Sequence, residues 1–277
     1  MKLSIITITF NDIAGLKDTY RSIIQQTFRD FEWIVVDGGS TDGTREFLKE
    51  HDSEIAFWCS EPDKGVYNAQ NKGTEHARGE YSIYMNSGDS FYDGDVLEKV
   101  FKEGTDADIV YGNTLLVFED GKTMTKYAPD EPDMSFFYNE NLFHQAMFIK
   151  TKLILDLPYD ESFQIFADWN EWLTLYLQGK SFEKKDMVVC KFLFGGLSTS
   201  TSNDLDAKRK EELSILREKF YPEPWRKAMS RVGFLSTDYC YLKAKRKQHN
   251  RIIRILIVVC CLLLVTNILT VIYICVK

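Results

Sequence analysis

The chain has 277 residues, with 34 Lys and Arg against 41 Asp and Glu and a formal net charge of −7. No acidic residue follows Leu242, so the part before it is more acidic still, and an acidic surface excludes general nucleic-acid binding as a function class. Hydrophobic residues make up 44% of the chain and aromatic residues 14%, which supports a packed core and excludes a disordered chain.

The first 110 residues alternate strand and helix patterns. Residues 3–9 are a β-branched run that predicts a strand, and apolar residues at helical spacing predict a helix after a cap at Asn11 or Asp12. The alternation continues in the strand patterns EWIVVDGG and YSIYM and in the helical patterns near residues 45–50, 66–73 and 96–101. Such an order predicts right-handed crossovers and an α/β fold with a mostly parallel sheet flanked by helices.

The pattern loosens after Asp108. The segments ADIVYGNTLLVF, FHQAMFIK and VVCKFLF predict strands, and residues 167–177 and 205–220 predict helices. Internal repeats and low-complexity linkers are absent from the sequence, so we expect residues 1–222 to form one domain.

The C-terminal part predicts a membrane anchor. From Ile255 to Val276 the chain carries no charge, and a helix of that length, at about 1.5 Å per residue, would cross the hydrocarbon of a bilayer. Cations cluster before this run, which by the positive-inside rule places the acidic body in the cytoplasm. We therefore expect a helical basic neck over 223–251, a transmembrane helix over 252–276, and a single-pass protein whose partners include the membrane.

Three turns after apolar strands carry polar residues suited to a ligand: Thr9 to Asn11, Asp37 in VVDGGSTDGT, and Asn86 to Asp89 in YMNSGD. In parallel sheets ligands bind beyond the carboxyl ends of the strands, so these turns can converge. Phe10 can stack on a base, and Asp37 can accept a hydrogen bond from a base imide or a ribose hydroxyl. Taken alone, VVDGGSTDGT fits a turn that caps a helix equally well.

Asp89 is a candidate metal ligand. It follows a strand and a Ser-Gly turn, and Mg²⁺ commonly uses one or two carboxylates together with substrate phosphates. An Asx turn that caps the next helix explains the same residue equally well.

Several strings together resemble the family 2 inverting glycosyltransferases of the GT-A fold, a Rossmann-like α/β fold, in particular bacterial enzymes of colanic-acid and related surface-polysaccharide assembly. These strings are SIITITFND, WIVVDGGSTDGT, SEPDKGVYNAQNKG, GEYSIYMNSGDSF, FHQAMFIK and ADWNEWL, in the family's order over about residues 1–180. The resemblance implies a transferase of the hexosyltransferase type that uses a nucleotide-sugar donor.

The same resemblance implies roles for individual residues. Thr9 and Phe10 would line the nucleoside pocket, and Asp37 would contact the base, usually uracil. The residues from Asn86 through Ser87 to Asp89 would stand at the DxD position, with Asp89 holding Mg²⁺ or Mn²⁺. Asp168 would be the general base.

The sequence departs from the family pattern at two places. NSGD has one carboxylate where two or three are usual, which puts strict metal dependence in question. AQN replaces the more common Ala-Arg-Asn and removes a cation that could meet the diphosphate, for which Lys64 or Lys72 are the candidate substitutes.

Four further residues have both a functional and a packing interpretation. His144 and Gln145 could reach the sugar donor or the acceptor, although a lone histidine is more often a packing residue. Asp63 and Lys64, ahead of a helix, could touch the sugar donor or form an exposed ion pair.

The predicted helix that carries Asp168 has other candidates of its own. Glu171 is the nearest substitute for Asp168 as a base, but we expect it to face solvent. Trp169, Trp172 and Tyr176, at spacings of three and four, favour a core position over a sugar-stacking platform.

The expected reaction is inverting transfer of a sugar, most simply from a UDP-sugar, to a lipid-linked or growing glycan in surface-polysaccharide biosynthesis. Two alternatives remain at this point: transfer to a polyprenyl phosphate, and a non-catalytic scaffold that binds nucleotide sugars.

Overall fold

The computed structural model of the chain describes residues 1–195 and 202–229. Internal contacts divide the chain into a compact unit, Met1–Phe220, and a second unit from Tyr221 onward. Residues 223–229 are helical, but most of the expected neck over 223–251 and all of the expected span over 252–276 lie outside the described residues. The domain boundaries predicted from the sequence therefore stay predictions.

The expected membrane location is corrected. Among the helices within residues 1–195 and 202–229, none is both long and apolar enough to cross a bilayer. The single-pass location with its catalytic domain in the cytoplasm is accordingly withdrawn.

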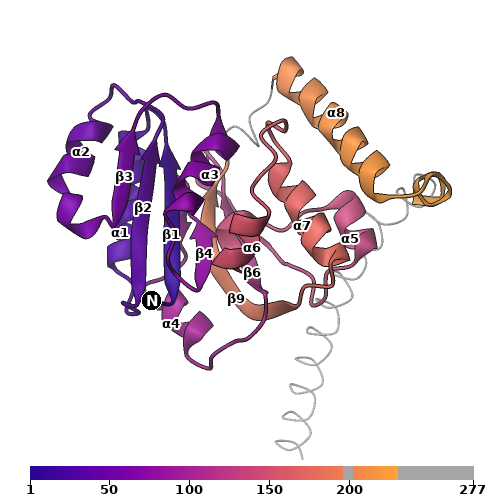
Figure 1. The fold of residues 1–277 in the computed structure, drawn as a ribbon, viewed down its shortest axis with the longest axis horizontal. Coiled ribbons are helices and arrows are strands. Elements are labelled where there is room, and N and C mark those ends of the chain that lie inside the picture. Colours follow the sequence, from indigo (N-terminus) through magenta and orange to yellow (C-terminus); the bar gives the residue numbers. More distant parts are fainter. Residues whose placement is uncertain (196–201, 230–277) are drawn as a thin grey trace, which may run out of the picture. The chain divides into compact units, whose positions relative to one another are not determined.

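The N-terminal half of the sheet is parallel, as the sequence predicts. Its strands β1 (Leu3–Thr9), β2 (Phe31–Asp37), β3 (Phe57–Ser60) and β4 (Tyr81–Tyr84) lie side by side in the order β3-β2-β1-β4 (Figure 1). The short, half-buried β3 is not evident from the sequence pattern.

Helices α1 (Ile13–Ile24), α2 (Thr44–Glu50), α3 (Val66–Glu75) and α4 (Val96–Phe101) connect these strands to one another and to the rest of the sheet. Alternate residues of β1 face opposite helical layers: Leu3 and Ile5 belong to the cluster that includes Leu16 of α1, whereas Ile8 packs with Ala69 of α3. Both faces of β1 are therefore buried, which explains its uninterrupted apolar and β-branched run.

The C-terminal half of the sheet is mixed rather than parallel. Strands β8 (Met147–Lys150) and β6 (Ile109–Val117) continue the sheet from β4 with antiparallel pairs, and β9 (Phe182–Leu193) pairs parallel with β6. Strand β5 (Ser90–Phe91) pairs with β9 at the edge opposite β3, and β7 (Thr123–Lys126) pairs with β6. The remaining elements are α5 (Met134–Asn139), α6 (Thr151–Asp156), α7 (Ala167–Leu177), α8 (Asn203–Phe220) and two short 3₁₀ helices, η1 (Asp52–Glu54) and η2 (His144–Ala146).

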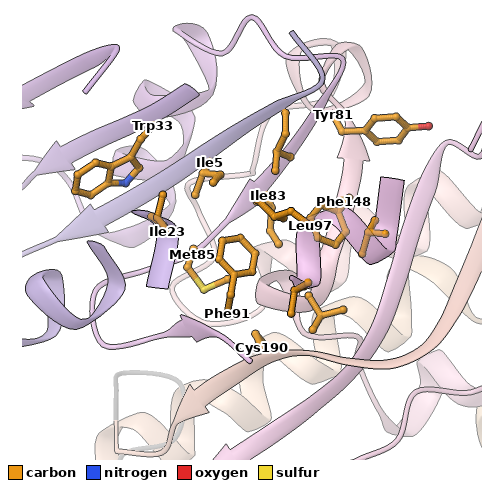
Figure 2. Packing of buried hydrophobic residues seen from close by; sticks show 14 of the residues in the cluster. Ile5, Ile23, Trp33, Tyr81, Ile83, Met85, Phe91, Leu97, Phe148 and Cys190 are labelled. Atoms are coloured by element: carbon orange, nitrogen blue, oxygen red, sulfur yellow. The ribbon is translucent and has the colours of Figure 1, made fainter. Parts of the chain in front are cut away.

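One cluster of apolar side chains joins the two halves of the sheet. Figure 2 shows Ile5 of β1 and Ile83 of β4 in the same cluster as Phe148 of β8 and Cys190 of β9. Both halves thus share a core within the unit Met1–Phe220, and this fixes the carboxyl end of β1 relative to the segment that carries His144.

Helix α3 packs very closely on the sheet. A Cβ atom at Gly73 would lie 2.5 Å from Cγ2 of Ile6, a distance that side chains do not tolerate, so only glycine permits this approach. The close packing holds the N-terminal end of α3, which begins after Gly65, at the carboxyl edge of the sheet.

Candidate active site

A cavity of about 970 Å³ opens at the carboxyl ends of β1 and β4. Its wall comes from the turns after these strands, the start of α3, η2, the start of α7 and the end of β9. The candidate residues that line it are Thr9, Phe10, Asp63, Asn86, Ser87, Asp89, His144 and Asp168. Turns far apart in the sequence therefore meet at one site.

The side of the cavity next to the end of β1 has a buried hydroxyl and an exposed ring. Thr9 is only 5% exposed, and its Oγ1 has no hydrogen-bond partner within the described part of the chain. Phe10 is 63% exposed and lines the cavity, so its ring is accessible to a planar ligand.

Asp37 lies beside the cavity but does not line it. It is fully buried in the register position next to Thr9. Its carboxylate accepts hydrogen bonds from the hydroxyls of Ser40 and Ser60. A contact between Asp37 and a base stays a prediction.

Asn11 and Lys64 also lie outside the cavity wall. Asn11 has φ = 49°, a left-handed conformation that asparagine tolerates better than most residues. Its Oδ1 accepts from Thr41 N at 2.9 Å, which joins the turn after β1 to the turn after β2. Lys64 is exposed, while Lys72, the other candidate cation, pairs with Glu61 at 2.7 Å.

Asp89, the last residue of the NSGD turn, is buried. Gln145 Nε2 donates to its Oδ2 at 2.9 Å, and Leu193 N donates to its Oδ1 at 3.1 Å. Burial raises the pKa of Asp89 to about 6, and the negative charge of Asp12 adds to this effect. Gln145, which also lines the cavity, thus orients this carboxylate, and its contact with a substrate stays a prediction.

Asp168 lies in the first turn of α7, where the helix dipole favours a negative charge. Its Oδ2 is 3.3 Å from His144 Nδ1, and its Oδ1 accepts from Trp169 N at 2.7 Å. Tyr67 OH lies 3.4 Å from the same Oδ1. The Asp168 side chain is 12% exposed and lines the cavity, so it is held in place and still open to a substrate.

A chain of hydrogen bonds behind Asp168 defines the tautomer of His144. Gln70 Nε2 donates to Asn86 Oδ1 at 3.2 Å, and Asn86 Nδ2 lies 3.1 Å from His144 Nε2. With the Asn86 amide in this orientation, its nitrogen donates to His144 Nε2, and Nδ1 carries the proton toward Asp168. Gln70, the middle residue of AQN, thus contacts the NSGD turn.

Glu171 is buried, which contradicts the expectation that it faces solvent. It is 2% exposed, and neither carboxylate oxygen has a hydrogen-bond partner within the described part of the chain. Burial, with the charge of Asp168 as a second cause, raises the pKa of Glu171 well above its usual range. Glu171 also does not line the cavity, so it is not placed to take a proton from a substrate there.

The aromatic residues of α7 pack as the sequence predicts. Trp172 is fully buried, and Tyr176 has its ring 5.7 Å from that of Phe137. Trp169 donates from Nε1 to Phe137 O at 2.8 Å, although it also lines the cavity.

Glu171→Gln is expected to make the stability of the protein less dependent on pH. In wild type the unfolded chain loses this proton near the ordinary glutamate value of 4.5, while the folded protein keeps it to higher pH. The free energy of unfolding that the protonated carboxyl contributes is therefore lost as the pH rises from the pKa of Glu171 in the unfolded chain to its higher pKa in the folded protein. The uncharged amide avoids that loss, so the variant gains in free energy of unfolding relative to wild type between pH 4.5 and 7. Urea unfolding at both pH values measures the difference, and an equal difference at both would contradict the assignment.

Residues 4–164 match the family model for Glycosyl transferase family 2. The chain belongs to this family. It is therefore a glycosyltransferase, an enzyme that uses a nucleotide sugar.

Proteins that are similar to this chain in sequence are also named glycosyltransferases. The chain is 29% identical over 246 residues to a PGL/p-HBAD biosynthesis glycosyltransferase of Mycobacterium bovis, covering 84% of this chain and 94% of that one. An uncharacterized glycosyltransferase of Methanocaldococcus jannaschii is 26% identical over 224 residues, 76% of each chain.

Solved structures share the fold. TarS of S. aureus in complex with UDP-GlcNAc has a TM-score of 0.62 at 18% identity, covering 85% of this chain and 72% of that one. The mannosyltransferase PcManGT from Pyrobaculum calidifontis, in complex with GDP-Man and Mn²⁺, has a TM-score of 0.55 at 18% identity, covering 79% and 63%. The glycosyltransferase thus has the GT-A-like α/β fold that the sequence predicts.

The cavity of this glycosyltransferase is acidic. Its carboxylates are Asp12, Asp63, Asp89, Glu119, Glu140 and Asp168. Lys126, which also lines the cavity, pairs with Glu140. A sugar diphosphate would therefore need an additional cation at this site.

Asp89 fits a divalent cation that takes its other ligands from the sugar donor and water. Each of its oxygens accepts one hydrogen bond and retains a lone pair. Within the described residues no group of three or more His, Cys, Asp or Glu is placed to hold a metal alone. This donor set suits Mg²⁺ or Mn²⁺, which commonly keeps few protein ligands when a phosphate is present.

Proposed function

We propose that this glycosyltransferase transfers a hexose from a UDP-sugar to a hydroxyl of a growing or lipid-linked glycan, with inversion at the anomeric carbon. The observation that carries the proposal is that Asp168 and Asp89 line the same cavity. One carboxylate is oriented by a histidine and the other by a glutamine amide and a backbone N–H.

The sugar-donor end of the cavity would bind the nucleotide. Phe10 would stack on the base, and Asp37, one strand away, would recognise the base imide after a shift of the Ser40 hydroxyl that now occupies it. Asp89, together with Asn86 and Ser87 of the same turn, would face the diphosphate. A divalent cation bound by Asp89 would stabilise the charge that develops on the leaving nucleoside diphosphate.

Asp168 would remove the proton from the acceptor hydroxyl as its oxygen attacks the anomeric carbon. His144 Nδ1–H, directed to Oδ2, would hold the carboxylate in orientation while leaving its other lone pairs free. With one base and no enzyme nucleophile the reaction is a single displacement, which inverts the configuration, as in inverting hydrolases.

The acidic lining favours a neutral acceptor over a polyprenyl phosphate. Asp63, Glu140 and Asp168 all line the cavity, and like charges in a partly desolvated site repel an anionic acceptor. A phosphate acceptor would also have little need of a base. Membership of the glycosyltransferase family argues against the alternative of a non-catalytic scaffold.

Release of nucleoside diphosphate tests this proposal. Purified protein is incubated with UDP-GlcNAc or GDP-mannose, with Mn²⁺ or with a chelator, and the free diphosphate is measured by chromatography alongside a thermal-shift assay. We expect slow release of UDP that stops with the chelator, and a rise in melting temperature because the sugar donor binds only the folded protein. A rise in melting temperature without any release of diphosphate would overturn the proposal, and release from GDP-mannose alone would overturn the choice of UDP.

A further inference from the structure

Helix α8 places a buried carboxylate against the segment that leads into α7. Glu212 is 1% exposed. Its Oε1 accepts from Gln164 N at 2.7 Å, and its Oε2 accepts from Ile165 N and Phe166 N, each at 3.0 Å. Three consecutive backbone N–H groups therefore converge on one side chain, which is a strong way to hold a turn because each bond is charge-assisted.

This turn carries the candidate base. Phe166 is the N-cap residue of α7, and Asp168 is the second residue of the helix. Ile165 and Phe166 also line the cavity. A displacement of residues 164–166 would therefore move both Asp168 and part of the cavity wall.

The turn is held from the other side by α3. Tyr67 OH donates to Ile165 O at 2.5 Å. The turn is thus fixed between a hydroxyl from α3 that binds its carbonyl and a carboxylate from α8 that binds its amides, so neither contact alone fully defines its position.

A second contact aligns α8 with α7. Lys219 Nζ donates to Asn170 Oδ1 at 2.7 Å, and Figure 1 shows the two helices as neighbours. Helix α8 lies after the part of the chain that matches the family model, which ends at residue 164. The contacts that α8 makes with the site therefore come from residues outside the part of the chain that the family model matches.

We propose that Glu212 is a positioning residue for the general base: it holds the turn 164–166 so that Asp168 faces the acceptor hydroxyl. The inference rests on the proposed function, because it needs Asp168 to act as the base. Glu212 itself does not line the cavity and touches no substrate. Its effect is on the rate of the chemical step and not on binding of the sugar donor.

The test compares Glu212→Gln with Glu211→Gln. Glu211 is the adjacent glutamate, exposed and paired with Lys208 at 3.0 Å. An amide in place of the Glu212 carboxylate turns an N–H₂ group toward backbone N–H donors, so the turn must move. We expect kcat to fall by about 10- to 100-fold, since a misplacement of about 1 Å costs up to about 100-fold. The KM for the UDP-sugar should stay within about twofold, and Glu211→Gln should match wild type.

Glu212→Asp provides a second variant in case Glu212→Gln does not fold. It keeps the charge but shortens the side chain by one carbon, and we expect a kcat between those of wild type and Glu212→Gln. A kcat equal to wild type in either folded variant would overturn the inference. So would a parallel loss of kcat and donor affinity, because that would show general unfolding of the site.

Asp168→Asn, assayed in parallel, separates the inference from the proposed function. Full activity of Asp168→Asn would refute the base assignment, and the role of Glu212 would fall with it. An inactive Asp168→Asn beside a fully active Glu212→Gln would leave the proposed function standing and refute only the inference.

Discussion

Asp168→Asn is expected to lower kcat for sugar transfer by about 10²- to 10⁴-fold, the usual contribution of a general base. The amide keeps the size of the side chain and can still accept from Trp169 N, the contact that Oδ1 now makes at 2.7 Å. It cannot take a proton from the acceptor hydroxyl. Because the proposed donor site lies at the other end of the cavity, the affinity for the sugar donor should stay within about twofold. Steady-state kinetics and calorimetry with a UDP-sugar measure the two effects separately.

Asp156→Asn is a suitable control for that experiment. Asp156 is an exposed residue at the end of α6 and does not line the cavity, so its loss tests only the effect of removing one acidic charge. Turnover of Asp168→Asn near the wild-type rate would remove Asp168 from the mechanism.

Asp89→Asn is expected to weaken Mn²⁺-dependent binding of the sugar donor. The amide retains the shape of the carboxylate in its buried position but loses the negative charge that a cation requires. The affinity for the sugar donor in the presence of Mn²⁺ should fall by at least about 10- to 100-fold. This is the effect of removing a residue that only hydrogen-bonds to a metal ligand, and Asp89 would be a ligand itself. Calorimetric titration of the UDP-sugar in the presence of Mn²⁺ measures this affinity.

The same titration with a chelator provides the internal control for Asp89. Without a divalent cation, wild type and Asp89→Asn should bind the sugar donor with similar weak affinity, because the substitution does not alter the contacts proposed for Phe10 and Asp37 with the nucleotide. Equal affinities in the presence of Mn²⁺ would exclude Asp89 as the metal ligand.

Much of the N-terminal half could be predicted from the sequence because its signals are local. The strand Leu3–Thr9 has the uninterrupted apolar and β-branched pattern of a strand buried on both faces. The cap at Asp12, one of two predicted alternatives, accepts from Gly15 N at 3.0 Å. The turns that follow parallel strands converge because strand direction alone places their ends at one edge.

The C-terminal half was less predictable because its elements are defined by distant pairing. Residues His144–Ala146 were predicted as part of a strand but form η2, and only Met147–Lys150 pair with β4 and β6. Strands as short as Ser90–Phe91 carry no periodicity of their own and exist because β9 provides hydrogen-bond partners.

The sequence by itself determined the residue types at the site: an aromatic and a threonine after β1, one carboxylate in NSGD and one in ADWNEW. Only the tertiary structure decided which carboxylates line the cavity and which are buried away from it. Glu171, predicted to be exposed, is buried beside Asp168, and Glu212, in a charged helix next to the exposed Glu211, binds three backbone amides. The physical reason is that the solvation of a carboxylate and its hydrogen-bond partners depend on segments far away in the chain, which local patterns do not report.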